Sequence, residues 1–309
     1  MELIEERTLL GIDVGGTKTA VVLGDETLNI LARAEFLTEP ELGFQSFIER
    51  LSSEIIGLTG DLIPSRVGIS VGGPMDCKTG TLFNPPHLRW GTVNIVQPLV
   101  ERFGFSITIE HDGRAGALAE GILGAGRGFL NIVFLTLGTG LGAGIIINGS
   151  IYSGSTGLAG EVGHMRVAED GPSLYGKNGS WESFCGGTGI SLYAHYRFPE
   201  RFGRGMTAQE ISRLALKKDP NAITVLEESG AYFGEGLAVL LDILDPDRII
   251  LGNLAWRLPK IWLEAALKRA AEEALVGDEA RNRVVITELK DRIGDYAALI
   301  VASGMGRRR

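Results

Sequence analysis

The stretch from Thr136 to His164 constrains the fold more than any other part of the sequence. An apolar run ends in Gly138-Thr139-Gly140, a second apolar run follows at Ile145–Ile147, and the stretch closes on Glu161 and His164. Apolar runs separated by glycine predict two strands joined by a tight turn, and the backbone N–H groups of such a turn can bind an anion. The stretch therefore indicates a phosphate-contacting turn that leads into a polar pocket.

Composition limits the class of protein. The 309 residues are 44% hydrophobic, which predicts two domains or two lobes of one fold. The net charge is −8 with no basic stripe except the tail Arg307–Arg309, so we expect no nucleic-acid partner. No apolar run reaches the ~18 residues of a membrane span, and only Cys77 and Cys185 are present. We therefore expect a soluble cytoplasmic protein without disulfides or a membrane partner.

The order of elements predicts an α/β protein. The region near residue 13 repeats the plan of strand, Gly/Thr turn and strand, from Leu9–Val14 to Ala20–Asp25. Strands then alternate with helices, which include one helix over Glu182–Tyr196 and another that begins at a capping box of Thr207 and Glu210. Two glycine hairpins of the same plan predict two related lobes.

Two familiar nucleotide motifs are matched only in part. Gly11–Lys18 is close to a P-loop, but Thr17 separates the last glycine from Lys18 and a strand follows instead of a helix. Gly138–Ala143 has the letters of the dinucleotide fingerprint, and Glu161 lies where its ribose acid would be. The apolar run that follows is a poor helix, so neither a P-loop nor a dehydrogenase is predicted.

Carboxylates and glycines at strand ends supply the candidate chemistry. Asp13 next to Gly15-Gly16-Thr17 suits a hydrated Mg²⁺ near phosphate oxygens, and Lys18 would add positive charge. Asp112 follows a strand and precedes a helix, where it could accept a proton from an attacking hydroxyl or simply cap the helix. The whole set favours phosphoryl transfer.

The chain resembles the ROK family of repressors, open reading frames and sugar kinases from about residue 8 to 304. The segments that carry the resemblance are Asp13–Lys18, His111-Asp112, Leu137–Gly144, Gly160–His164, Pro246–Gly252 and Gly294–Ala302. It implies a glucokinase-like sugar kinase with the actin-like ATPase (ribonuclease H-like) fold, with ATP and sugar in a cleft between two lobes. We expect one lobe at 1–112 plus 295–309 and the other at 113–294.

The resemblance also implies roles for single residues. Asp112 corresponds to the catalytic base, which acts on a sugar hydroxyl, usually at C6 of a hexose or N-acetylhexosamine. The implied sugar-binding residues are Gly72, Gly73, His111, Glu161, His164 and Glu182. The implied nucleotide-binding residues are Asp13, Gly15, Gly16, Thr17, Lys18, Gly138, Thr139, Gly140 and Gly252. Asp13 would hold Mg²⁺ directly or through water.

The sequence departs from its family on the sugar side. Most members have a Cys-rich loop that holds a structural zinc with the His164 equivalent, whereas this chain has Ser173, Tyr175 and Ser180, and Cys185 lies too far along. One His without three thiolates does not make a tetrahedral site, so we predict no structural zinc.

Further departures leave the identity of the sugar open. His111 and Arg114 stand where Asn is common in the family, and His87 replaces another common Asn. An unusual hexose, an amino sugar or a sugar-like polyol is compatible with these changes.

Two alternatives to a kinase remain. A repressor of this family would need an N-terminal winged helix, and here the phosphate turn already begins at Asp13 in a negatively charged chain. A catalytically inactive sugar-binding regulator is the stronger alternative, because of His111 and the altered zinc loop. Many family members are dimers, so a homodimer is compatible with the sequence, although no segment marks an interface.

Overall fold

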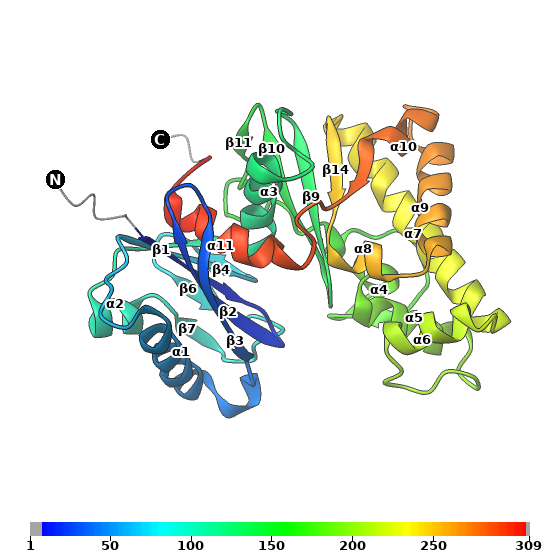
Figure 1. The fold of residues 1–309 in the computed structure, drawn as a ribbon. Coiled ribbons are helices and arrows are strands. Elements are labelled where there is room, and N and C mark those ends of the chain that lie inside the picture. Colours follow the sequence, from blue (N-terminus) through cyan, green and yellow to red (C-terminus); the bar gives the residue numbers. More distant parts are fainter. Residues whose placement is uncertain (1–7, 307–309) are drawn as a thin grey trace. The chain divides into compact units, whose positions relative to one another are not determined.

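The computed structural model describes residues 8–306 and divides into two compact units, which are described separately (Figure 1). The first unit contains the chain up to Ile122, Ser150–Leu158 and the chain from Asp291; the second contains Leu123–Gly149 and Ala159–Lys290. The lobe boundaries expected from the sequence remain a prediction. The tail Arg307–Arg309 lies outside the described residues.

The first unit is built on a five-stranded sheet in the order β3-β2-β1-β4-β8. Its strands are β1 (Thr8–Val14), β2 (Lys18–Asp25), β3 (Ile30–Leu37), β4 (Arg66–Val71) and β8 (Ile107–His111). The strands β1, β2 and β3 pair antiparallel, whereas β4 runs parallel to both β1 and β8. The strand β1 therefore forms both a glycine hairpin with β2 and one of three parallel strands whose carboxyl ends meet.

Helices cover the two faces of this sheet. Helix α1 (Phe44–Thr59) packs on β2 and β3, and its buried Phe47, Ile48, Leu51 and Ile55 share one core with Leu10 and Ile12 of β1. Helix α11 (Ile293–Ser303) packs on the other face, where Gly11 and Gly68 let it approach the sheet. A Cβ atom at Gly68 would lie 2.2 Å from the backbone nitrogen of Ala302, so glycine is required for this close packing.

Short elements complete the first unit. They are η1 (Pro40–Leu42), β5 (Met75–Asp76), β6 (Thr81–Phe83), β7 (Thr92–Asn94), α2 (Gln97–Phe103), α3 (Asp112–Leu123) and η4 (Lys290–Arg292). The strands β5, β6 and β7 form a separate antiparallel sheet. Helix α3 begins directly after β8, which places Asp112 at the junction of strand and helix.

The second unit is built on a mixed sheet that contains the strands β10-β9-β14-β15 in this order. These strands are β9 (Ile132–Leu137), β10 (Leu141–Ile147), β14 (Arg248–Leu251) and β15 (Val284–Ile286). The short strand β11 (Ser150–Ile151) belongs to the segment 150–158 of the first unit. The glycine hairpin β9–β10 is antiparallel, and β14 runs parallel to β9 and β15. Each unit therefore repeats a glycine hairpin joined to parallel strands, which confirms the predicted α/β class.

Helices of the second unit surround a core centred on Trp181, Phe233 and Trp262, each fully buried. The long elements are α5 (Gly187–Arg197), α6 (Ala208–Leu216), α7 (Pro220–Leu244) and α9 (Lys260–Glu273). The short ones are η2 (Val162–His164), β12 (Ser173–Leu174), β13 (Lys177–Asn178), α4 (Trp181–Cys185), α8 (Asn253–Arg257), η3 (Gly277–Glu279) and α10 (Ala280–Arg283). The predicted capping box of Thr207 and Glu210 is present at the start of α6.

The single helix expected over Glu182–Tyr196 is wrong. The structure breaks it into α4 and α5 at Gly186, whose backbone is extended with φ −68° and ψ 169°. A Cβ atom there would lie 3.0 Å from the carbonyl oxygen of Thr139, so this glycine lets the chain pack closely against the β9–β10 turn. A tertiary contact, not local propensity, sets the break. No helix within residues 8–306 is long and apolar enough to cross a membrane.

Candidate functional site

In the first unit, the predicted site residues gather at the carboxyl ends of three strands. Asp13 lies near the end of β1, Gly72 follows β4, and Asp112 follows β8. The register pairs Asp13 with Ser70 across β1 and β4, and Ser70 with Glu110 across β4 and β8. These three polar residues therefore form one row on the face of the sheet that packs against α11.

The pKa of the Asp13 carboxyl group in this row is shifted far from its usual value. Burial raises its pKa to about 7, while a hydrogen bond with Ser70 opposes the shift and the charges of Asp112 and Asp295 add to it. A Cβ atom at Gly294 would lie 2.0 Å from Oδ2 of Asp13, so the first turn of α11 is in direct contact with this carboxyl group. A half-buried carboxyl group near Asp112 and Asp295 is well suited to a cation.

The β1–β2 turn presents its backbone beside Asp13. The N–H of Gly15 donates to the carbonyl of Lys18 over 3.0 Å, and the hydroxyl of Thr38 donates to the carbonyl of Gly15 over 2.7 Å. Gly16 packs against the backbone of His87, and Thr17 at the tip is exposed. The loop that carries His87 therefore lies directly beside the predicted phosphate turn.

Lys18 forms an ion pair with Glu35. Its ammonium donates to Oε1 of Glu35 over 2.5 Å, and Arg33 donates to the other oxygen of the same carboxylate over 2.8 Å. Arg33 also bonds both oxygens of Asp295, at 3.0 and 2.9 Å. The charge predicted for phosphate binding is therefore partly compensated by Glu35.

Asp112 is held on one oxygen and open on the other side. Its Oδ1 accepts the N–H of Gly113 over 2.7 Å, and 40% of its side chain is exposed. Nδ1 of His111 lies 3.2 Å from the same Oδ1, and the imidazole packs against Gly73. Gly72 lies on the side of Oδ2, which is 3.9 Å from the Cβ position of this glycine. Asp112, His111, Gly72 and Gly73 therefore lie together.

In the second unit, the β9–β10 turn is open at its tip and tightly packed behind it. Gly138 and Thr139 are exposed, and a Cβ atom at Gly138 would meet nothing within 4 Å. Behind the turn, the N–H groups of Gly187 and Thr188 at the start of α5 donate to the carbonyls of Gly138 and Thr139, at 2.8 and 3.0 Å. The helix therefore fixes the carbonyl side of the turn and leaves its other side accessible.

Glu182 connects this turn to the segment that carries Glu161. Its Oε2 accepts the N–H of Leu141 over 2.9 Å, and the Cβ position of Gly140 lies 3.1 Å from both of its carboxylate oxygens. The Cβ position of Gly163 lies 2.9 Å from the same Oε2. The structure thus brings Glu182 onto the glycine turn, so one predicted sugar ligand has a role in holding the turn.

Glu161 directly precedes the helix η2, His164 is its last residue, and both are exposed. The loop that follows forms the hairpin β12–β13 at the positions where the sequence lacks the family's cysteines. Tyr175 and Gly176 have φ of 50° and 76°, as a tight type I′ turn requires, and Lys177 donates to the carbonyl of His164. This hairpin supports the backbone of His164.

Gly252 lies at the same end of the second sheet as Gly138. It follows β14, donates its N–H to the carbonyl of Leu135 over 2.9 Å and precedes α8. A Cβ atom there would lie 2.7 Å from that carbonyl oxygen. The structure therefore places Gly252 beside the strand that leads into the glycine turn.

The oxygen donors at Asp13 suit Mg²⁺ better than a transition metal. No group of three or more His, Cys, Asp or Glu side chains within residues 8–306 is arranged to hold a metal ion. Mg²⁺ commonly binds one or two carboxylates and completes its shell with water and phosphate oxygens. Asp13 fits that mode, because it offers one carboxyl group beside a glycine turn.

Sequence reasoning missed two neighbours of Asp13. Ser70 is the only hydroxyl in the strand β4 and lies between the apolar Ile69 and Val71, which was a usable signal. Gly294 contacts Asp13 from a segment 281 positions later, and no local pattern connects the two residues. Glu110 and Cys77 were also not singled out, although both contact Arg114.

The sequence matches the ROK family over residues 9–305. The chain belongs to the ROK family. It is 30% identical over 314 residues to a glucokinase of Streptomyces coelicolor, covering 96% of this chain and 97% of that one. It is also 31% identical over 255 residues to a xylose repressor of Bacillus spizizenii, covering 79% of this chain and 63% of the repressor.

The fold agrees with solved structures of the family. A ROK family glucokinase from Streptomyces griseus, in complex with glucose and AMPPNP, matches with a TM-score of 0.81 and 29% identity, covering 96% of this chain and 99% of that one. This match confirms the predicted actin-like ATPase fold.

Proposed function

We propose that the chain is an ATP-dependent sugar kinase in which Asp112 is the general base. The observation that carries the proposal is the position of Asp112, which is fixed on Oδ1 by Gly113 but 40% exposed at the carboxyl ends of β4 and β8. A side chain that capped α3 would accept from an N–H two or three residues on, whereas Oδ1 of Asp112 accepts from the adjacent Gly113 and Oδ2 lies on the side of Gly72. The similarity to ROK glucokinases, one of them solved with glucose and an ATP analogue, supports the same conclusion.

The reaction is transfer of the γ-phosphoryl group of ATP to a sugar hydroxyl, usually the one at C6. The hydroxyl oxygen attacks the γ-phosphorus, the bond to the bridging oxygen breaks, and ADP leaves. Asp112 accepts the hydroxyl proton as the new bond forms, a contribution of ~10²–10⁴-fold. The carboxylate suits this step because Gly113 fixes its orientation.

Residues of both glycine turns bind the phosphates in this proposal. In the first unit these are Gly15, Gly16 and Thr17, with Asp13 holding Mg²⁺ directly or through water. In the second unit they are Gly138–Gly140, with Gly252 near the nucleoside. When bound, Mg²⁺ neutralises charge on the phosphate oxygens. The open backbone at Gly138 supports this assignment, because its Cβ position is free of protein atoms.

In this proposal, a different set of groups binds the sugar acceptor. Exposed Glu161 and His164 provide a carboxylate and an imidazole, which together can accept from and donate to neighbouring hydroxyls. His111 and the backbone of Gly72 and Gly73 lie beside Asp112. Glu182 is part of the same proposal, with its contact to Leu141 as a second role.

A coupled ADP-release assay over hexoses, N-acetylhexosamines and cyclitols tests the function. We expect at least one acceptor to be phosphorylated, and Asp112→Ala to lower kcat by ~10²–10⁴-fold with little change in the thermal unfolding midpoint. Absence of turnover with every acceptor, or full activity of the Asp112 variant, would refute the proposal.

The second candidate is a sugar-binding regulator without catalysis, which the similarity to a xylose repressor supports. The same screen separates the two candidates when sugar binding is measured by calorimetry beside turnover. Sugar binding without ADP release would favour the regulator.

A further inference from the structure

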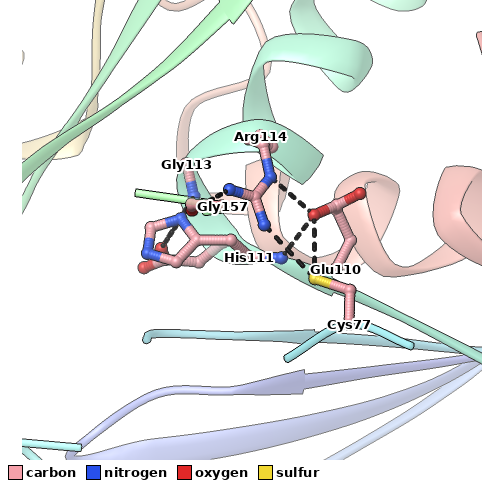
Figure 2. A network of polar contacts seen from close by, with 7 residues as sticks. Cys77, Glu110, His111, Gly113, Arg114 and Gly157 are labelled. Atoms are coloured by element: carbon pink, nitrogen blue, oxygen red, sulfur yellow. Dashed lines mark hydrogen bonds and ion pairs between the residues drawn. The ribbon is translucent and has the colours of Figure 1, made fainter. Parts of the chain in front are cut away.

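Arg114 lies in the first turn of α3 with only 3% of its surface exposed (Figure 2). Its guanidinium donates to three acceptors: Oε1 of Glu110 over 2.7 Å, the carbonyl of Gly157 over 2.9 Å and Sγ of Cys77 over 3.2 Å. A planar fork can serve three such acceptors at once, which a lysine ammonium cannot do with the same geometry.

Glu110 connects Arg114 to the backbone of His111. We call Arg114, Glu110 and Gly157 together the anchor. The same Oε1 that accepts from Arg114 also accepts the backbone N–H of His111 over 2.9 Å (Figure 2). Burial lowers the pKa of Arg114, but the charge and hydrogen bond of Glu110 outweigh this and raise it overall. The charged pair therefore persists in the folded protein and braces the turn before Asp112.

Gly157 extends the anchor to a second part of the chain. It belongs to the segment 150–158 and is followed by Leu158, Ala159 and Gly160, after which comes Glu161. In the second unit, the carbonyl of Gly160 accepts the N–H of Ala143 over 2.7 Å, and its φ of 101° fixes the backbone there. Only two residues separate Gly157 from Gly160, and the carbonyl of each accepts a hydrogen bond. The backbone just before Glu161 therefore has little conformational freedom.

We propose that Arg114 is a positioning residue for the sugar acceptor, which it orients by holding His111 through Glu110 and Glu161 through Gly157. This inference rests on the proposed roles of His111 and Glu161 as sugar ligands. Arg114 itself is buried and touches no sugar. A buried ion pair is weak evidence of a purely stabilising role, because well-packed apolar side chains often stabilise a core as well.

The test compares Arg114→Lys and Gly157→Ala with a matched control, Gly154→Ala. Lysine keeps the charge beside Glu110 but cannot serve all three acceptors. Gly154 has a φ of 71°, close to the 84° of Gly157, and lies in the same segment. Of these two glycines, Gly157 is the one whose carbonyl accepts from Arg114. The control therefore introduces similar backbone strain without touching the anchor.

Glucose affinity is measured by calorimetry without nucleotide, and KM for acceptor and ATP by ADP release. Since a displacement near 1 Å can change rates by ~10²-fold, we expect Arg114→Lys and Gly157→Ala each to weaken glucose binding and raise acceptor KM about tenfold. KM for ATP should stay within about twofold, because the residues of the anchor are not those proposed to bind the nucleotide. Gly154→Ala should bind glucose like the wild type.

The double variant Arg114→Lys/Gly157→Ala gives the deciding readout. If one anchor links the two residues, the double variant should be no weaker than the worse single variant within about twofold, whereas independent effects would multiply. Multiplying effects, an unchanged glucose affinity in Arg114→Lys, or an equal loss in Gly154→Ala would overturn the inference.

The binding and turnover measurements distinguish failure of the kinase proposal from failure of the positioning role. A wild type that binds glucose without phosphorylating any acceptor contradicts the kinase function but leaves the affinity comparison decisive for Arg114. A wild type that phosphorylates sugars while Arg114→Lys binds glucose normally contradicts only the positioning role. A wild type that neither binds nor phosphorylates any sugar contradicts both.

Discussion

The two glycine hairpins have the same plan but are stabilised in different ways. The β1–β2 turn lies beside the half-buried carboxyl group of Asp13, which contacts Ser70 and the start of α11. The β9–β10 turn is held from behind by backbone groups of α5 and by Glu182, which accepts the N–H of Leu141. The first hairpin thus concentrates negative charge, and the second offers neutral backbone.

Two hairpins with similar sequence patterns can therefore have different functions. A carboxyl group whose pKa lies near 7 can exchange a proton for a cation, which suits metal binding. A turn with open N–H groups suits an anion and needs no side-chain charge. We therefore expect ATP binding to depend on side-chain charge at the first hairpin and on backbone shape at the second.

The largest expected effect comes from exchanging carboxylates for amides at both hairpins. Asp13→Asn keeps the shape but removes the proposed Mg²⁺ ligand, so we expect kcat/KM for ATP to fall on the order of 10²-fold or more. Glu182→Gln keeps an acceptor for the N–H of Leu141, so its effect on the same constant should stay below about tenfold. Equal losses in steady-state kinetics of the two variants would contradict the division of tasks.

Asp13 also makes stability depend on pH. Its folded pKa of about 7 lies above the usual aspartate value of 3.8, so folding takes up a proton between these values. Stability contributed by the protonated form is present below pH 3.8 and is lost as pH rises through about 7. At pH 8, Asp13→Asn should therefore be more stable than the wild type by roughly 2–4 kcal/mol in the free energy of unfolding. Its unfolding temperature should be higher accordingly.

Thermal melts of both proteins without ligand, from pH 5 to pH 8, check this prediction. The gap between the variant and the wild type should shrink toward pH 5. Glu182→Gln serves as the control, because its carboxylate contacts the second hairpin. A gap for Asp13→Asn that stays constant over this range would show that the carboxyl group does not titrate in it.

Much of the local structure could be predicted from the sequence. Both hairpins and the junction of strand and helix at Asp112 follow from apolar runs broken by glycine, which is local information. The capping box at Thr207 is equally local. These features depend on residues within a few positions of one another, and the structure confirms them.

The contacts that set the chemistry could not be predicted in this way. Gly294 contacts Asp13 only because α11 returns to the first sheet. The break at Gly186 depends on the β9–β10 turn, which is distant in sequence. Arg114 stands out in the sequence only as a departure from the family, yet it is buried against Glu110 and Gly157. Such pairings arise from tertiary packing and leave no periodic signal.

Substitutions at Gly186 and Gly138 test separately the stability of the second hairpin and its binding of ATP. A Cβ atom at Gly186 would lie 3.0 Å from the carbonyl of Thr139, so Gly186→Ala should destabilise the protein by about 1–3 kcal/mol. Gly138 has free space at its Cβ position, so Gly138→Ala should melt like the wild type but raise KM for ATP about tenfold, because the methyl group occupies the ligand side. Melting curves and ATP kinetics together decide, and a wild-type KM in Gly138→Ala would remove this turn from the phosphate site.

The smallest expected effect concerns Lys18, which the sequence assigned to the phosphates. Its ammonium lies 2.5 Å from Glu35, and 59% of its side chain is exposed. Exposed ion pairs contribute at most about 1 kcal/mol and weaken in salt. We therefore expect Lys18→Met to raise KM for ATP no more than about fivefold, since the pair leaves little net charge for the nucleotide.

Repeating the Lys18→Met measurement at low and high salt distinguishes a diffuse charge effect from a direct contact. A diffuse effect should disappear at high salt, because ions screen exposed charges over about 10 Å at 0.1 M. Glu35→Gln provides the opposite case, since it frees the ammonium and should lower KM for ATP slightly at low salt. If Lys18→Met instead weakened apparent ATP affinity by about two orders of magnitude and the loss persisted in salt, Lys18 would have to leave Glu35 and bind phosphate directly. The first hairpin would then bind through side-chain charge of both signs.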